Sequence, residues 1–404
     1  MMERMDSEAF EQGAAFVPRA RESWRSPWEM YARLRDHDPA HHVEAGDYWV
    51  LSRFDDVFAA ARDHETFSSA EGLTFEYDER RKAGLTEAAP IVMMDPPEHT
   101  AFRRLVGKGF TPRHVQEIEP AVRAFVVDRI ERLRERGSGD IVAELLKPMP
   151  SFVVAFYLGV PERDWARFDG WTEGIVAANS EGDALRAGDA VAELLTYFSE
   201  LIEEKRRNPG DDTISALVAT GEADVPLMQV LGFAFTMVAG GNDTTTGLLS
   251  TGCELLTRFP EQRAHLFADP GLLPTAVEEM LRLSSPVQGL ARTTTRSVEL
   301  HGREIPEGRK VLLLYASANR DPRKFGETAE EFEVDRDVTP IMTFSYGAHF
   351  CLGASAARLQ ARVVLEELLE RCPRFAVDHE AGTFAPGHYV RRYESLPFVA
   401  DGGV

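Results

Sequence analysis

The ten-residue stretch Phe344-Ser-Tyr-Gly-Ala-His-Phe-Cys-Leu-Gly353 decides how the rest of the chain is interpreted. One cysteine, Cys351, stands between Gly347 and Gly353, and residues 354–369 after it have strong helical character. Free backbone N–H groups and the helix dipole favour negative charge at such a helix start, so the sequence predicts a thiolate there. Cys351 is therefore a candidate for a reactive nucleophile, for a metal ligand, or for a small buried core residue.

These three interpretations make different demands on the neighbouring residues. A nucleophile needs a histidine base within reach, and His349, two positions earlier, need not face the sulfur. A zinc or iron–sulfur site needs further ligands, but Cys253 and Cys372 are distant in sequence. The flanking glycines argue against an ordinary core residue. A metal with one protein ligand needs a macrocycle for its other positions, which indicates haem with thiolate ligation.

The pattern Phe-x-x-Gly-x-His-x-Cys-x-Gly over residues 344–353 resembles the haem-binding signature of the cytochrome P-450 family of haem-thiolate monooxygenases. This resemblance implies haem b as cofactor, with Cys351 as the axial iron ligand and Phe344 shielding it from water. Gly353 would let the backbone approach the porphyrin, and N–H groups after the cysteine would tune the iron. Ser345 and Tyr346 depart from the small residues more usual there, which predicts a looser loop.

Composition fits a cytoplasmic enzyme. The chain has 404 residues, of which 44% are apolar and 27% charged, and its net charge of −21 disfavours nucleic acid. Three cysteines indicate a reducing compartment. The N-terminus lacks an apolar signal region, and the longest apolar run is too short for a bilayer, so we expect no membrane contact. The resemblance covers almost the whole chain, which implies one domain over residues 1–404.

Apolar periodicity predicts a mainly helical fold with a smaller strand-rich portion, consistent with the cytochrome P-450 fold. Helices are expected at 99–108, 115–136, 141–157, 164–179, 184–207, 225–258 and 275–283. Strands are expected within roughly 41–53, 286–318 and 383–399. The helix over 225–258 would be roughly 50 Å long, enough to cross the molecule.

Two adjacent glycines, Gly240 and Gly241, interrupt this longest helix and cost it about 2 kcal/mol relative to alanine. Either they allow close packing of another helix, or they leave room for a ligand. The resemblance implies the second, with the helix passing over the haem and widening locally for dioxygen. It also implies that Asp243 and Thr244 are the catalytic acid–alcohol pair that delivers protons.

Glu279 and Arg282 lie three residues apart, so they share a helix face and can form an ion pair. Alone, this is a weak motif that usually marks a solvated surface pair. The resemblance implies a structural role in supporting the haem loop, with a third member that is Arg336 by position or Arg320 as the second choice.

Four cations match the family positions that bind the haem propionates. His99 and Arg103 lie four residues apart on one helix face, and Arg292 and His349 would complete the site. Charge-assisted hydrogen bonds to a buried carboxylate are stronger than hydrogen bonds between neutral groups, so residues of this kind are suited to binding a propionate.

The substrate region is assigned by order along the chain. Residues 68–95 correspond to the loop that roofs the family's active site, and residues 168–189 to its mobile lid. The expected lining is mostly apolar, which predicts an apolar or amphipathic small-molecule substrate, with Asn242 and Gln288 as candidate polar anchors. The lining residues are Val92, Met93, Phe235, Val238, Val287, Gln288, Leu290 and Tyr389.

The predicted function is a haem-thiolate monooxygenase that hydroxylates or dealkylates this substrate with dioxygen. No flavin or nicotinamide fingerprint is visible, so electrons would come from a ferredoxin and its reductase. One alternative is a peroxide-driven peroxygenase or an isomerase on the same fold, and the Asp243–Thr244 pair counts against it. The other is a haem-based ligand sensor, which the apolar roof and the lack of a signalling domain disfavour.

Overall fold

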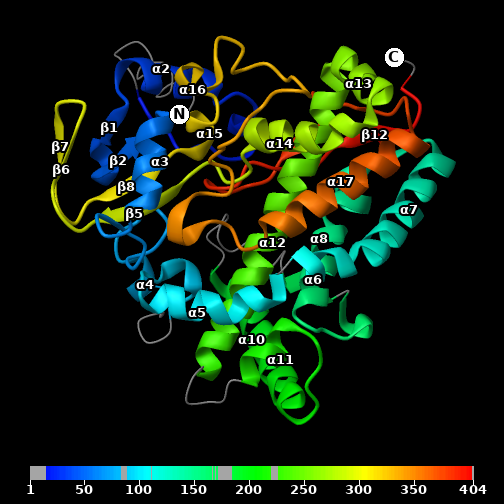
Figure 1. Ribbon diagram of the computed structural model, residues 1–404, viewed down its shortest axis with the longest axis horizontal. Helices are drawn as coiled ribbons and strands as arrows, with labels where there is room; N and C mark the ends of the chain where they lie inside the picture. The colour runs from blue at the N-terminus through cyan, green and yellow to red at the C-terminus, as the bar shows by residue number, and fades with distance from the viewer. Residues whose placement is uncertain are drawn as a thin grey trace.

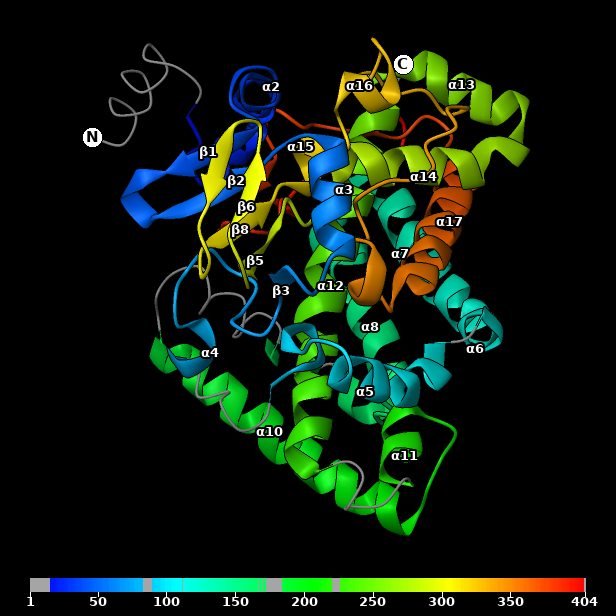
Figure 2. The same ribbon diagram turned by 60° about the vertical axis from the view of Figure 1, so that its left-hand side comes forward.

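The structure of the protein is a computed structural model that describes residues 15–82, 89–110, 112–165, 167–168, 170–171, 184–219 and 226–402. Helices make up most of the molecule, and a mixed sheet with its connecting hairpin lies at one side (Figure 1; Figure 2). This arrangement confirms the expected mainly helical fold with a smaller strand-rich part. In the described part of the chain, no helix is long and apolar enough to cross a membrane.

The helices follow the predicted order with shifted ends. The longer ones are α2 (Trp28–His37), α3 (Phe54–Arg62), α5 (Glu98–Val106), α7 (Glu119–Arg136), α8 (Pro148–Tyr157), α10 (Ala184–Arg207), α12 (Leu227–Arg258), α13 (Pro260–Ala268), α14 (Leu273–Ser284) and α17 (Ala354–Arg371). The shorter ones include α4 (Glu79–Lys82), α6 (Pro112–Glu117), α11 (Thr213–Val218), α15 (Tyr315–Ala318) and α16 (Pro322–Phe325). Most of the helix expected over 164–179, and most of the lid expected over 168–189, lie outside the described residues.

One predicted helix differs for a clear reason. The stretch 141–157 forms a π-helix, Val142–Leu146, followed by a separate helix α8 that starts at Pro148. Proline lacks an N–H group, so it cannot continue a preceding helix but is well suited to the first turn of a new one. The apolar spacing alone did not reveal this break.

Two of the three expected strand regions combine into one five-stranded sheet. Its order is β1 (Ala40–Val43), β2 (Tyr48–Leu51), β8 (Lys310–Leu313), β5 (Leu290–Thr294) and β3 (Phe67–Ser68). Strand β2 runs parallel to β8, with Tyr48 opposite Lys310, whereas β5 and β8 are antiparallel. The N-terminal hairpin is thus joined edge to edge with strands from the last third of the chain.

Smaller sheets complete the strand-rich part. They are the hairpin of β6 (Val298–Leu300) and β7 (Arg303–Ile305), the pair β10 (Thr383–Phe384) and β11 (Tyr393–Ser395), and a set in the order β4 (Ser138–Asp140), β12 (Pro397–Val399), β9 (Ala376–Val377). The sequence did not predict β3, β4 or β9, because strands of two or three residues are too short to show an alternating pattern.

Helix α12 runs through the middle of the molecule (Figure 2) and is about 48 Å long at 1.5 Å per residue. It packs against α8, α14 and α17, and most of its residues from Asn242 to Leu256 are buried. The helix is α-helical over its whole described span, Leu227–Arg258, so the expected local widening is wrong.

The two glycines of α12 serve different needs. A Cβ atom at Gly241 would lie 2.6 Å from Cγ2 of Val154 on α8, so this glycine lets the two helices approach closely. A Cβ atom at Gly240 would meet nothing within 4 Å, and Gly240 is exposed in the middle of the helix. The two alternatives considered for the pair therefore both apply: Gly241 allows close helix packing, and Gly240 leaves open space beside the helix.

Replacing Gly241 with alanine should lower the free energy of unfolding by about 1–3 kcal/mol, because the added methyl group overpacks the contact with Val154. Replacing Gly240 with alanine is the matched control. That change should raise the free energy of unfolding by about 0.5–1 kcal/mol, since it gains helix propensity without a clash. Urea unfolding measures both, and equal effects of the two changes would contradict this assignment.

Candidate active site

The Cys351 loop is a tight turn that lies against helix α3. The N–H group of Cys351 donates to the carbonyl of Phe344 over 2.9 Å, which closes the loop. Gly347 has a φ of +70° and approaches α3 so closely that a Cβ atom would lie 3.0 Å from the carbonyl oxygen of Ala61. Only glycine meets both requirements without strain.

Aromatic side chains fix this loop in place. The ring of Tyr346 lies 4.7 Å from that of Phe58 on α3, and Tyr315 donates from its hydroxyl to Ser345 over 3.3 Å. The buried ring of Phe344 packs under the guanidinium of Arg358, 4.7 Å away. The looser loop expected at Ser345 and Tyr346 is therefore wrong, because the larger residues there have packing and hydrogen-bond partners.

The thiol of Cys351 lies three residues before the start of α17 and keeps accessible surface. Burial by the surrounding protein raises the pKa of this thiol, and the N–H groups of Gly353 and Ala354 with the Arg103 and Arg358 guanidiniums only partly oppose it. The helix start alone therefore does not produce a thiolate. A bound metal would supply the positive charge that displaces the proton.

In the described residues, no group of three or more His, Cys, Asp or Glu side chains is placed to hold a metal ion. A metal at Cys351 thus needs a ligand set that the chain does not provide, which a porphyrin would supply.

His349 is not placed as a base for the sulfur. Its ring lies 4.3 Å from the ring of His99, and it forms a hydrogen bond with the backbone of Met94. Burial, together with the nearby Arg292, His99 and Arg103, lowers the pKa of His349 to about 2. An imidazole of such low pKa is too weak a base to take the proton of the Cys351 thiol, so the metal-ligand interpretation of Cys351 is favoured.

The structure brings the four expected propionate-binding residues together. His99 and Arg103 come from α5, Arg292 from β5 and His349 from the 3-10 helix Gly347–His349. Burial and the neighbouring Arg103 lower the pKa of His99 to about 4. Loss of hydration is the largest cause of this lower pKa, and the nearby carboxylate of Asp95 opposes it only in part.

Two ring nitrogens of this cluster, Nδ1 of His99 and Nε2 of His349, are buried without a hydrogen-bond partner among the described residues. Native proteins rarely leave such atoms unpaired unless a ligand satisfies them. The carboxylates of a haem are of the right charge and chemistry, so the residues present fit this group.

The residues expected to handle protons lie on the middle of α12, which runs beside the Cys351 loop in both views (Figure 1; Figure 2). The hydroxyl of Thr244 donates to the carbonyl of Gly240 over 2.8 Å, one turn earlier on the open side of the helix. The carboxylate of Asp243 accepts from Nε of Arg392 over 2.8 Å. Thr244 and Asp243 therefore have different partners on different sides of the helix.

The carboxylate of Glu279 is fully buried and binds two arginines. Arg282 approaches it at 2.6 and 2.7 Å, and Nε of Arg336 lies 3.1 Å away. Arg282 also donates to the carbonyls of Asn319 and Ala329. Arg320, the second choice for the third member, instead pairs with Glu330 and stacks on Trp28, so the structure places Arg336 in this position.

The expected substrate-lining residues divide into two groups. Val92, Phe235, Val287 and Leu290 are partly buried against the core, and Tyr389 is half-exposed with its ring 5.3 Å from that of Phe75. Met93 and Val238 are buried. The 3-10 helix Ile91–Met93, which carries Val92 and Met93, packs against both α5 and α12.

Gln288 is not placed as a polar anchor for a substrate. Its amide oxygen accepts from the hydroxyl of Tyr31 over 3.0 Å, and its amide nitrogen donates to the carbonyl of Ser285 over 2.7 Å. Because both ends of the buried amide are already paired, Gln288 joins α2 to the end of α14. The position of Gln288 in the chain predicted a substrate contact, but its side-chain amide is instead hydrogen-bonded to Tyr31 and Ser285.

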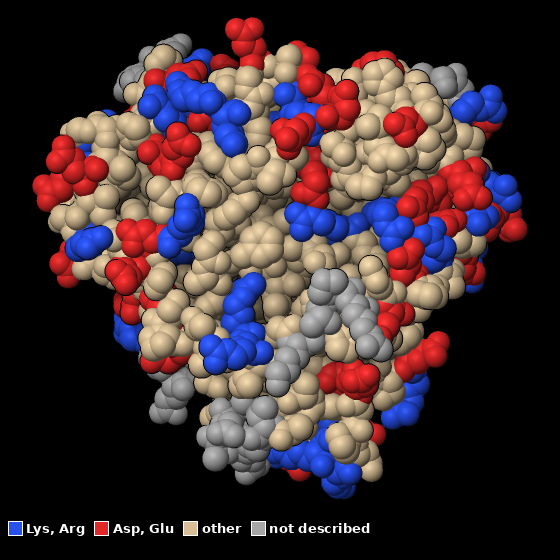
Figure 3. All heavy atoms as spheres, in the orientation of Figure 1, with Lys and Arg blue, Asp and Glu red and all other residues tan. Residues whose placement is uncertain are grey.

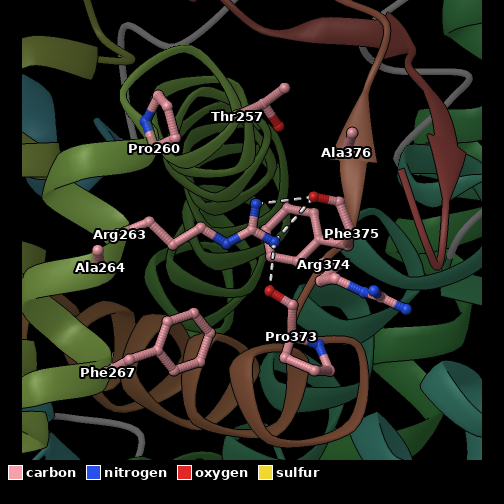
Figure 4. A pocket seen from close by; sticks show the side chains of 9 residues that line it. All are labelled: Thr257, Pro260, Arg263, Ala264, Phe267, Pro373, Arg374, Phe375 and Ala376. Carbon is pink, nitrogen blue, oxygen red and sulfur yellow. Dashed lines mark hydrogen bonds between the residues drawn. The ribbon is translucent and has the colours of Figure 1, made fainter. Parts of the chain in front are cut away.

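A pocket that does not include Cys351 lies between α13, the end of α12 and the segment that leads into β9 (Figure 4). Its lining is mostly apolar apart from two arginines and Thr257. The guanidinium of Arg263 stacks on Phe375 and donates to the carbonyls of Pro373 and Phe375 at 2.8–2.9 Å. These contacts connect α13 to the turn after α17, which is a structural role.

Sequence reasoning missed two arginines near the site. Arg392 pairs with Asp243, and Arg358 covers the ring of Phe344. Neither lies in a motif with a fixed spacing. The buried acid in the middle of an apolar helix was a signal that a cation must lie nearby, but it did not identify which one.

Together, the fold and this site define a haem protein with cysteine thiolate ligation. A cytochrome P450 family model matches residues 264–382. The chain is 57% identical over 387 residues to cytochrome P450 130 of Mycobacterium tuberculosis, covering 93% of this chain and 96% of the relative. It is 36% identical over 382 residues to the cytochrome P450 monooxygenase PikC of Streptomyces venezuelae, covering 92% and 90%.

Among solved structures, Mycobacterium marinum cytochrome P450 CYP268A2 in complex with pseudoionone superposes with a TM-score of 0.85 at 33% identity, covering 93% of this chain and 96% of that one. The chain belongs to the cytochrome P450 family. It is a monooxygenase whose cofactor is a thiolate-bound haem.

Replacing Glu279 with glutamine should lower the free energy of unfolding by about 3–5 kcal/mol, because Arg282 and Arg336 then lose their buried counter-charge. The neighbouring Glu278 pairs with Arg358 at the surface, so Glu278→Gln should cost less than about 1 kcal/mol. Urea unfolding followed by circular dichroism measures both variants. A small loss for Glu279→Gln would show that the buried ions are not needed for stability.

Proposed function

We propose that the enzyme inserts an oxygen atom into an apolar small molecule bound between α12 and the Cys351 loop, with electrons from a separate redox protein. The observation that carries this is the cluster of the Cys351 thiol with four cationic or imidazole side chains, which interact with one another although they come from separate elements. Each turnover consumes dioxygen, two electrons and two protons, and yields the oxygenated product and water.

The chain's own part in holding the cofactor follows from charge. Haem, when bound, supplies the iron chemistry that activates dioxygen. Cys351 would bind the iron through sulfur, and His99, Arg103, Arg292 and His349 would bind the two propionates. Because burial lowers the pKa values of His99 and His349, hydrogen bonds from these two imidazoles to the carboxylates should raise both pKa values again.

Protons would reach the oxygen through two side chains of α12. The hydroxyl of Thr244 is held by the carbonyl of Gly240, so it can turn toward the open side of the helix and donate there. Asp243 precedes it and would replace the proton that Thr244 gives up. This pair favours dioxygen and electrons over a peroxide-driven or isomerase reaction, because those reactions need no proton delivery.

The substrate is proposed to be apolar because the lining offers few unpaired polar groups. Val92, Phe235, Val287 and Leu290 are aliphatic or aromatic, and Gln288 is occupied by internal hydrogen bonds. The pseudoionone complex of the similar structure supports the same class of ligand. Binding would therefore depend mainly on the burial of apolar surface.

We place the electron donor, a ferredoxin supplied by its reductase, on the face shown in Figure 3, which carries basic side chains around its central recess. Arg62 and Arg104 are exposed, and the backbone of Arg62 lies against Gly347 of the Cys351 loop. Arg103, next to Arg104, donates to the carbonyl of Phe350 in that loop. An acidic partner would be steered to these cations, although the chain as a whole is acidic.

The first test is spectroscopic. The reduced, carbon-monoxide-bound protein should show the red-shifted absorption band of a thiolate ligand, and Cys351→Ser should lose it. Product should form with ferredoxin, its reductase and dioxygen. Product with hydrogen peroxide but not with electrons and dioxygen would support the peroxygenase alternative, and ligand binding without any product would support the sensor.

The second test concerns the donor surface. Arg62→Gln and Arg104→Gln should each raise the KM for ferredoxin about 3- to 10-fold at low salt, and the difference should shrink at high salt because exposed charges are screened. The matched control is Arg303→Gln, which should leave this KM unchanged. Arg303 lies on the β6–β7 hairpin, at the left edge of Figure 1. Equal effects at all three positions would place the donor elsewhere.

A further inference from the structure

One face of α12 is occupied by the C-terminal hairpin, residues 383–395, which includes β10 and β11. This face carries Asp243, Gly247, Thr251 and Glu254, whose spacings of four, four and three align them along the helix. Gly240 and Thr244 follow a neighbouring line that is open. Asp243, the acid proposed to supply protons, thus lies on the hairpin face, whereas the next residue, Thr244, lies on the open side of the helix.

Each residue of the hairpin face contacts the hairpin. A Cβ atom at Gly247 would lie 2.7 Å from the carbonyl oxygen of Arg391, so the two backbones nearly touch. Arg391 donates to the hydroxyl of Thr251 over 3.3 Å, and Tyr393 donates to Glu254 over 3.0 Å. Between them, Arg392 binds Asp243. The hairpin therefore cannot slide along α12 without breaking several contacts.

The hairpin is also held from its other side, by the N-terminal segment. Nε of Arg391 donates to the carbonyl of Trp24 over 2.9 Å, and the indole N–H of Trp24 donates to the carbonyl of Gly387 over 3.0 Å. Trp24 is buried, so this connection is part of the core. Arg392 thus extends from a rigid support, and its position relative to α12 is fixed.

The pair of Arg392 and Asp243 is largely desolvated, with side-chain exposures of 7% and 11%. Buried ion pairs add little net stability compared with apolar residues of the same size, because both charges lose their hydration. Helix α12 already has hydroxyl, carboxylate and glycine contacts with the hairpin at Thr251, Glu254 and Gly247. Stability alone therefore gives no reason for a charged pair one residue before Thr244.

We propose that Arg392 is a positioning residue for proton delivery, which holds the carboxylate of Asp243 on the hairpin side of α12 between proton transfers. This inference rests on the proposed function of Asp243 and Thr244. A proton from solvent binds the carboxylate as the ion pair opens, passes to the Thr244 hydroxyl as that hydroxyl gives its own proton to the oxygen, and the ion pair then closes again. Arg392 keeps its protons throughout.

The same hairpin also reaches the substrate region. Val390 bridges Val287, and Tyr389 contacts the roof residue Phe75 through its ring.

The test compares Arg392→Gln, Asp243→Asn and the double variant in the haem-loaded enzyme with its electron donors. Asp243→Asn should lower kcat about 100-fold, and Arg392→Gln about 10-fold, with a larger solvent isotope effect in each. The double variant should be no slower than Asp243→Asn alone, because Arg392 acts only through Asp243. Substrate affinity, measured by the optical spin-state shift, should be unchanged.

Folding is controlled in two ways. Arg392→Lys keeps the charge and should recover part of the rate, and the double variant leaves no unpaired buried charge, so it should fold even if Arg392→Gln does not. The thermal unfolding midpoint of every variant is measured alongside. Arg25→Gln is the matched control. Arg25 donates to the carbonyls of His379 and Gly382, in the segment just before the hairpin, and does not contact Asp243. It should lower the unfolding midpoint but leave the solvent isotope effect unchanged.

Two results would overturn the inference. One is an unchanged solvent isotope effect in both Arg392→Lys and Arg392→Gln. The other is a double variant whose kcat is a further tenfold below that of Asp243→Asn. Peroxide-driven turnover should be unchanged in all variants, because hydrogen peroxide brings its own protons. Failure of the proposed function would look different. In that case the unmodified enzyme itself would form product with peroxide but not with electrons and dioxygen.

Discussion

The constraint on which this site depends is the balance between burial and positive neighbours at a single sulfur atom. Burial opposes charge on Cys351, and two backbone N–H groups and two arginines do not fully compensate. The chain alone therefore does not favour the thiolate, and a bound metal would supply the positive charge that displaces the proton. A reactive cysteine for hydrolysis would need the opposite arrangement, with an exposed base and a lowered thiol pKa.

The same principle explains the charged groups around the sulfur. The cluster of His99, Arg103, Arg292 and His349 collects positive and potentially positive groups with few internal partners, whereas Glu279, Arg282 and Arg336 satisfy one another and several carbonyls. Both sets are buried or partly buried, but the first contains no carboxylate and the second contains its own. That difference separates a binding site from a structural support.

Much of this could be predicted from the sequence because it depends on local spacing. The Cys351 motif, the Glu279–Arg282 pair and the periodic helices have fixed intervals that can be counted. Contacts between distant segments could not be predicted in this way. The pairing of Arg392 with Asp243 and the capture of the Gln288 amide by Tyr31 both depend on how elements meet in space. The resemblance supplied Arg103 and Arg292, which no spacing in this chain could have brought together.

The parallel pairing of β2 with β8 also determines the order in which the protein can be completed during synthesis. Strand β2 emerges from the ribosome early, but its partner follows only after most of the helices have been made. His99 and Arg103 are likewise available long before Arg292 and Cys351. Because contacts between such distant segments form late in folding, the helical part can form first while the sheet and the haem-binding residues are still incomplete. The prosthetic group is then enclosed only near the end of synthesis, when the last third of the chain closes the cradle.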